Sequence, residues 1–271
     1  MTRREAETML ETGKGLLFGQ TFMRKEKEKK QRRLLIGTAA AVLAVLFLAG
    51  AVMIYLGTYY HADAEGAAAF ETVCEVPERE LAGIGTLYGQ GNEQAGLIFY
   101  PGAKVEESAY APLMRELASR GVCCVLCRMP YRLAILKKNA ADGVAELLPG
   151  VREWYIGGHS LGGVMAASYA ADHPEAFSGV VLLASYTTDD LSDSGLSVLS
   201  VYGSEDNVLN AAAYEKNREN LPRDLTETVI AGGCHAGFGM YGPQRKDGTP
   251  SVSAAQQIRI TADEILALTG D

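Results

Sequence analysis

The sequence predicts an α/β protein with a mostly parallel, doubly wound sheet, preceded by one N-terminal hydrophobic helix. Short apolar, β-prone runs alternate with stretches of helical composition from residue 96 onward, as in βαβ units. Residues 34–60 form a single uncharged run that comes before all of them. With 271 residues, 48% of them hydrophobic, the chain is long enough to bury a substantial core.

The individual elements follow from apolar runs and from the Gly and Pro residues that end them. In chain order we expect one or two irregular strands within 70–88, a strand at 96–100, a helix around 108–120, a strand at 122–127, a helical segment at 133–148, a strand at 151–157, a helix at 163–173, strands at 179–185, 196–203 and 225–230, and a closing helix at 254–268. Gly143 weakens the expectation for the segment at 133–148. Residues 186–196 leave no room for a helical lid, which predicts an open cleft and a small or accessible substrate.

Gly158-His159-Ser160-Leu161-Gly162 joins the strand at 151–157 to the Ala-rich helix after it. A strand, a G-x-S-x-G pentapeptide and a helix together form a nucleophile elbow, in which the serine occupies a strained turn and its Oγ projects freely. The flanking glycines let the strand and the helix pass close to each other. The pentapeptide alone is a weak signal in a chain with 30 glycines, so the assignment of Ser160 depends on its context and on partners downstream.

Two such partners follow strand ends in the expected order. Asp206 comes just after the strand at 196–203, where it can orient a histidine and stabilise its cation. His235 lies in a glycine-rich loop after the strand at 225–230 and is the expected general base. The order Ser160, Asp206, His235 is that of α/β-hydrolases. Each residue also has an ordinary interpretation, as a turn serine, a capping aspartate or a loop histidine. The remaining histidines fit the role of the base less well: His61, His159 and His173.

An oxyanion hole needs two backbone N–H groups directed at the developing alkoxide. Leu161, directly after the nucleophile, is expected to supply one of them. The second is assigned to Ala103, in the Pro101-Gly102-Ala103-Lys104 turn that follows the strand at 96–100. Lys104 and Arg128 also follow strand ends, where open α/β sheets bind ligands. We therefore hypothesise that one of these cations attracts a substrate carboxylate, with solvated surface charge as the alternative.

A family resemblance covers most of residues 70–270 and rests on four segments: Phe99-Tyr100-Pro101-Gly102-Ala103-Lys104-Val105, Gly157-Gly158-His159-Ser160-Leu161-Gly162-Gly163, Leu183-Ala184-Ser185-Tyr186 and Gly232-Gly233-Cys234-His235-Ala236. Together they resemble a compact bacterial branch of the α/β-hydrolase superfamily, similar to the dienelactone-hydrolase group. The resemblance implies an α/β-hydrolase fold and hydrolysis of an ester, thioester or related acyl bond without a cofactor. Many dienelactone hydrolases have cysteine at the position of Ser160, so their particular substrate does not transfer.

The uncharged run at 34–60 is long enough to cross a bilayer as a helix. Residues 24–33 precede it with seven basic and two acidic side chains, which predicts an N-terminus in the cytoplasm and the rest of the chain outside. A buried globular helix is one alternative, and a signal peptide cleaved at Ala62-Asp63-Ala64 is another. The run exceeds the ~7–15 residues of a signal-peptide core, which favours an uncleaved signal anchor. The expected organisation is a basic segment at 1–33, a transmembrane helix at 34–60, a linker at 61–69 and a catalytic domain at 70–271.

Charge divides along the same boundary. Residues 1–33 hold ten Lys/Arg against five Asp/Glu, a net charge of +5, while the rest holds 15 against 28, a net charge of −13. The basic segment can bind anionic lipid headgroups. It lacks interleaved aromatic residues, so no nucleic-acid partner is expected.

The five cysteines, at positions 74, 123, 124, 127 and 234, do not indicate a metal site. Cys124 and Cys127 form a C-x-x-C, but on a strand they point to opposite faces, and no second ligand pair is present. Buried thiols that pack as small hydrophobes are the expected state. Several free thiols are unusual in a protein that faces an oxidising exterior. Three explanations remain open: the thiols are buried, the environment is poor in oxygen, or the predicted topology is wrong.

These observations favour a membrane-anchored serine hydrolase that works through an acyl-enzyme without cofactor or metal. Its expected partners are a small-molecule acyl substrate and the lipid bilayer. An acyltransferase or a peptidase on the same fold is an alternative, because fold does not determine reaction. A catalytically silent binding protein with this fold is a further one.

Overall fold

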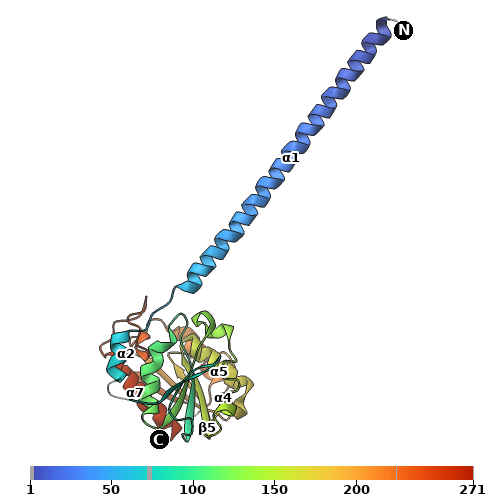
Figure 1. The fold of residues 1–271 in the computed structure, drawn as a ribbon. Coiled ribbons are helices and arrows are strands. Elements are labelled where there is room, and N and C mark those ends of the chain that lie inside the picture. The colour runs from blue at the N-terminus through green and yellow to red at the C-terminus, as the bar shows by residue number, and fades with distance from the viewer. Residues whose placement is uncertain (1–2, 72–74, 224, 271) are drawn as a thin grey trace. The chain divides into compact units, whose positions relative to one another are not determined.

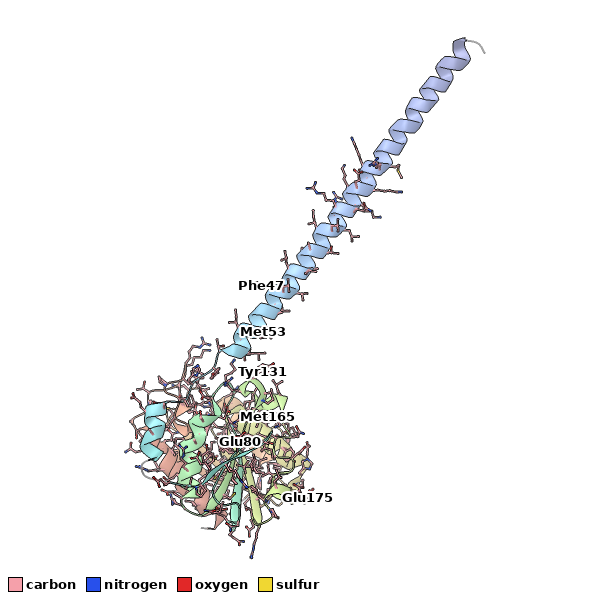
Figure 2. All side chains as sticks on the ribbon, viewed as in Figure 1. Phe47, Met53, Glu80, Tyr131, Met165 and Glu175 are labelled. Atoms are coloured by element: carbon pink, nitrogen blue, oxygen red, sulfur yellow. The ribbon has the colours of Figure 1, made fainter. Side chains whose placement is uncertain are left out.

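The computed structural model describes residues 3–71, 75–223 and 225–270, and the chain divides into two compact units, Met1–Gly57 and Thr58–Asp271 (Figure 1). The first unit contains the helix α1 (Arg3–Gly57). Its part from Met23 to Gly57 is long and apolar enough to cross a membrane, and the most apolar stretch of this part is exposed throughout. Side chains such as Phe47 and Met53 are accordingly exposed (Figure 2).

The second unit is built on an eight-stranded sheet in the order β1-β2-β4-β3-β5-β6-β7-β8. The strands are β1 (Glu78–Leu81), β2 (Gly85–Tyr88), β3 (Ala95–Tyr100), β4 (Val122–Cys127), β5 (Glu153–His159), β6 (Gly179–Leu183), β7 (Ser197–Gly203) and β8 (Thr226–Ile230). Pairing is antiparallel from β1 to β2 and from β2 to β4, and parallel between all later neighbours. The predicted fold class, a mostly parallel doubly wound sheet, is confirmed.

Helices cover both faces of this sheet (Figure 1). On one face α3 (Ala111–Ala118) and α7 (Ala254–Thr269) contribute apolar side chains to a shared core. On the other face α4 (Val144–Leu147) and α5 (Leu161–Asp172) do the same. The remaining helices are α2 (Ala64–Glu71) and α6 (Ala211–Lys216). Residues 184–196, between β6 and β7, contain no helix, in agreement with the expectation that no lid is inserted there.

The segment expected to be helical at 133–148 is a series of turns instead. It contains the 3₁₀ turn η3 (Ala134–Leu136) and ends in the single turn of α4. Gly143 lies immediately before α4 with a φ of 76°, so the backbone is left-handed where a continuous helix would need right-handed geometry. Just upstream, Tyr131 and Arg132 also have positive φ values, of 51° and 59°. These residues belong to a sharply bent loop that begins with the 3₁₀ turn η2 (Pro130–Arg132).

The folded unit begins earlier than the expected boundary at residue 70. The amide of Tyr60 donates to the carbonyl of Lys104 at 2.7 Å, and Tyr60 forms a parallel bridge with Val105. The amide of Asp63 donates to the carbonyl of Met240 at 2.7 Å. Because of these bonds Tyr60 belongs to the second unit and not to the hydrophobic helix, and part of the expected linker at 61–69 forms α2.

Three of the cysteines belong to the same strand, β4, and are fully buried. Strand alternation places Cys124 in the core on one face and Cys123 and Cys127 in the core on the other. Burial raises the pKa of Cys123 and of Cys127 to about 12. Cys234 is also a buried free thiol. Cys74, the fifth cysteine, is outside the described residues.

Candidate active site

Ser160 occupies the turn between β5 and α5. Its φ of 52° and ψ of −125° place it in a sparsely populated region for a non-glycine residue, as expected of a strained elbow. Its amide donates to the carbonyl of Leu183 at 2.9 Å, which ties the turn to the neighbouring strand β6. A Cβ on Gly162 would collide with the carbonyl oxygens of Tyr100 and Pro101. Glycine is therefore required where α5 passes over the end of β3.

Asp206 and His235 form a buried pair at the ends of β7 and β8. Oδ2 of Asp206 lies 2.8 Å from Nδ1 of His235, and the two side chains are 1% and 2% exposed respectively. Oδ1 of Asp206 accepts the amides of Val208 and Leu209, both at 2.8 Å. Both carboxylate oxygens of Asp206 are therefore engaged. The imidazole of His235 is held through its Nδ1, and its Nε2 remains for another partner. Parallel pairing brings the carboxyl ends of β5, β7 and β8 to the same edge of the sheet.

Ser160 and His235 line the same cleft at this edge. The other lining residues are Leu161, Val164, Ala184, Ser185, Tyr186, Val208, Leu209 and Asn210. Among the hydrogen bonds of the described residues, none joins the hydroxyl of Ser160 to the ring of His235. Such contacts are often long in free enzymes and shorten when substrate binds. The structure therefore brings the three predicted residues to one site, with Asp206 and His235 already bonded.

The two expected oxyanion donors have their amides available. In the part of the chain that the structure describes, neither the amide of Leu161 nor that of Ala103 has a hydrogen-bond acceptor. The loop around Ala103 is held on both sides. The amide of Lys104, with a φ of 62°, donates to the carbonyl of Arg132 at 2.8 Å, and its carbonyl accepts the amide of Tyr60. The loop is thus fixed by contacts that leave the Ala103 amide unused.

A buried Tyr–His pair, which the sequence analysis did not identify, links the elbow to this loop. The hydroxyl of Tyr110 accepts the amide of Gly102 at 3.1 Å and lies 2.8 Å from Nδ1 of His159. Burial, and then the neighbouring His235, lower the pKa of His159 well below its usual value, so its ring is neutral. The Tyr110 hydroxyl then donates to Nδ1 of His159. The ring centroids of His159 and His235 are 4.5 Å apart.

The loop that carries His235 has a second anchor that was also missed. Asp247 accepts the amides of His235 at 3.1 Å and of Ala236 at 2.8 Å. A carboxylate that accepts two consecutive amides fixes the backbone on which the imidazole is mounted. Asp247 lies twelve positions after His235 in an irregular segment, so no local pattern identifies it.

The structure distinguishes the two cations considered for substrate binding. Arg128 donates from Nε to Glu107 and from Nη1 to Glu80, both at 2.8 Å, so two carboxylates already meet its charge. Lys104 lies directly beside the Ala103 amide in the chain. A third cation, not identified from the sequence, is Arg132, whose guanidinium lies 3.4 Å from the ring centroid of Tyr59. The carboxylate hypothesis is therefore weakened for Arg128.

Comparison with known proteins identifies the family to which this fold belongs. A family model described as "Alpha/beta hydrolase family" matches residues 96–259. Est1E from Butyrivibrio proteoclasticus is 16% identical at a TM-score of 0.50, over 72% of this chain and 99% of that one. TT1662 from Thermus thermophilus is 16% identical at a TM-score of 0.53, over 73% and 99%. At this identity the two solved structures show the fold alone, and no curated protein matches the sequence. Because the family model spans more than half of its residues, the chain belongs to the alpha/beta hydrolase family and is a hydrolase.

Proposed function

We propose that this protein is a membrane-anchored serine hydrolase that cleaves an ester, thioester or related acyl bond through an acyl-enzyme. The observation that carries the proposal is the shared cleft of Ser160 and the His235–Asp206 pair, with the serine on a strained turn. The proposed nucleophile, base and orienting carboxylate come from the ends of three parallel strands, which supports activation of the serine hydroxyl by the imidazole.

In the proposed reaction, Oγ of Ser160 attacks the acyl carbonyl carbon while Nε2 of His235 takes the hydroxyl proton. The carbonyl oxygen becomes an oxyanion that accepts hydrogen bonds from the amides of Leu161 and Ala103. As the tetrahedral intermediate collapses, the bond to the leaving alcohol or thiol breaks, and that group receives the proton from His235. Water then gives a proton to Nε2 of His235 and attacks the acyl carbon. The bond to Oγ of Ser160 breaks, Oγ takes the proton back from His235, and the carboxylic acid is released. Asp206 orients the imidazole and stabilises its cation throughout.

The anchor is proposed from α1 and from the charges before it. The segment from Met23 to Gly57 has the length and apolarity of a span. The seven basic side chains within 24–33 favour an N-terminus in the cytoplasm and a catalytic unit outside it. The proposed location is therefore a single-pass membrane protein with its hydrolase unit on the extracytoplasmic side.

Labelling with a fluorophosphonate tests the proposed nucleophile. The probe should form a covalent adduct with the full chain, and the Ser160→Ala variant should lose it. Asp206→Asn should lower kcat by about 10⁴-fold, because the imidazole then adopts the wrong tautomer.

Ser185 provides the matched control because it lines the same cleft and its hydroxyl donates to the carbonyl of Ser160 at 2.8 Å. The Ser185→Ala variant should still be labelled. An adduct that persists in Ser160→Ala and maps to Ser185 or to another serine contradicts the assignment.

A further inference from the structure

The start of the second unit is bonded to both loops of the proposed active site. Tyr60 pairs with Lys104 and Val105 of the loop that carries the Ala103 amide. Its hydroxyl also accepts the amide of Arg245 at 3.2 Å, and the Asp63 amide donates to Met240, so the same segment reaches the region after His235. The chain therefore enters the second unit at the edge of the sheet where the proposed active site lies.

The covalent chain limits how far this edge can be from a membrane that α1 crosses. The helix ends at Gly57, and the amide of Tyr60, three residues later, donates to Lys104 of the proposed oxyanion loop. Three residues, even when fully extended, reach only about 10 Å. In a chain anchored by α1, the bonded residue of the proposed oxyanion loop must therefore lie within about 10 Å of the end of the span.

An exposed apolar loop lies at the same place. Tyr131, Ile135 and Leu136 are 55%, 60% and 54% exposed, and we call them, together with Arg132 and Tyr59, the mouth patch. The loop is fixed next to the active site because the carbonyl of Arg132 accepts the amide of Lys104 and its guanidinium covers the ring of Tyr59. Figure 2 shows the side chain of Tyr131 at the surface of the second unit.

The composition of the mouth patch matches the headgroup region of a bilayer. Tyrosine is enriched at membrane interfaces, where its ring is buried and its hydroxyl remains hydrated. Arginine can place its aliphatic stem along apolar surface and its guanidinium at phosphate. Ile135 and Leu136 are adjacent aliphatic side chains that only an apolar environment would cover. In water, the exposure of such a cluster is unfavourable.

We propose that the mouth patch inserts into the bilayer that α1 crosses, and that the substrate is an acyl ester lodged in this bilayer. The inference rests on the proposed function and adds the substrate class. The ester bond of an amphiphile lies at the depth of the headgroups, where the patch would hold the cleft of Ser160. The missing lid fits this arrangement, because the bilayer itself covers the opening.

The test uses the full chain in phosphatidylcholine vesicles and two esters of the same leaving group. p-Nitrophenyl acetate reaches the cleft from water, whereas p-nitrophenyl palmitate partitions into the bilayer. The double substitution Ile135→Asp/Leu136→Asp should lower turnover of the palmitate by about tenfold or more, because two aliphatic anchors are replaced by charges. Turnover of the acetate should be unchanged, which also shows that the variant is folded.

Leu147→Asp is the matched control. Leu147 is 58% exposed, similar to Leu136, but it belongs to α4, which precedes β5 and so lies toward the opposite edge of the sheet. It should change neither rate. Equal loss on both esters, no loss on the palmitate, or an equal effect of Leu147→Asp would each overturn the proposal.

A second copy of the chain is the competing occupant of the mouth patch. The palmitate measurement is therefore repeated in phosphatidylcholine nanodiscs that each hold a single chain. Persistence of the selective loss supports contact with the bilayer, and its disappearance overturns the proposal. An unsubstituted chain that neither hydrolyses the acetate nor takes up fluorophosphonate at Ser160 would instead refute the proposed function, and the inference would fall with it.

Discussion

Tyr110 shows how a single hydroxyl can connect the parts of an active site. It accepts the amide of Gly102 and bonds to His159, so it links the proposed oxyanion loop to the residue directly before the proposed nucleophile. Both side chains are fully buried. Because the Tyr110 hydroxyl accepts the amide of Gly102, it orients the turn in which the next amide, that of Ala103, remains available. We therefore expect Tyr110 to act as a positioning residue for the proposed oxyanion loop.

Tyr110→Phe should lower kcat by about tenfold or more with little change in KM, because a displaced oxyanion donor weakens binding of the transition state more than of the substrate. Steady-state kinetics with a soluble ester measures the two constants separately. Tyr186→Phe is the control. Tyr186 lines the cleft, but its hydroxyl has no hydrogen-bond partner within the described ranges. If Tyr110→Phe lowers thermal stability and leaves kcat intact, the pair has only a structural role.

At the scale of an element, β4 shows how the sheet tolerates cysteine. Its thiols alternate between the cores on the two faces and are fully buried. Desolvation raises the pKa of Cys124 as well as that of its neighbours, because a thiolate is unfavourable in an apolar core. Buried thiols of this kind react slowly whatever the compartment. The free cysteines are therefore compatible with an exterior location.

In a Cys74→Ser/Cys234→Ser chain, where β4 holds every remaining cysteine, the native protein should resist thiol-specific disulfide reagents at pH 8. With a pKa of about 12 for Cys123 and Cys127, only about one thiol in ten thousand is ionised at that pH. All three cysteines should react within the mixing time in denaturant. Addition of Ser204→Cys, at an exposed position, supplies a thiol that must react at once in the folded protein. Fast native reaction of β4 would mean that the strand opens.

At the scale of the whole molecule, charge and hydrophobicity separate the two units. The net charge of +5 precedes the uncharged run at 34–60, and the net charge of −13 lies entirely after it. The seven Lys/Arg residues within 24–33, next to the uncharged run, favour an N-terminus in the cytoplasm. In the proposed location outside the membrane, the acidic second unit is repelled by anionic headgroups. The two aliphatic residues and the arginine of the mouth patch would offset this repulsion locally.

Cysteine accessibility in intact cells tests the topology. In a background without reactive native thiols, Lys30→Cys, before the span, should react only with membrane-permeant reagents. Ser204→Cys, in the second unit, should react with impermeant reagents as well, provided the cell wall is permeable to them. Lysis should make both positions equally reactive. If Ser204→Cys becomes accessible only after lysis, the outside location is wrong.

The sequence by itself determined the sheet, its strands, the elbow and the absence of a lid. These features depend on local patterns: apolar runs of strand length, glycines at a strand–helix junction, and a connection too short for a helix. The positions of Asp206 and His235 also followed, because the carboxyl ends of parallel strands meet at one edge. Such signals lie within a few consecutive residues or in their order along the chain.

Only the tertiary structure revealed what holds this site in place. Tyr110 and His159 are 49 positions apart, Tyr60 and Arg245 are 185 apart, and Asp247 caps a loop through backbone amides that carry no side-chain signature. The left-handed residues Tyr131 and Arg132 were hidden for the same reason, whereas Gly143 already weakened the expectation of a helix at 133–148. The bent loop is stabilised from outside the segment, by the amide of Lys104 and the ring of Tyr59. Hydrogen bonds between distant backbone groups are independent of side-chain type, so a single sequence contains no pattern from which to predict them.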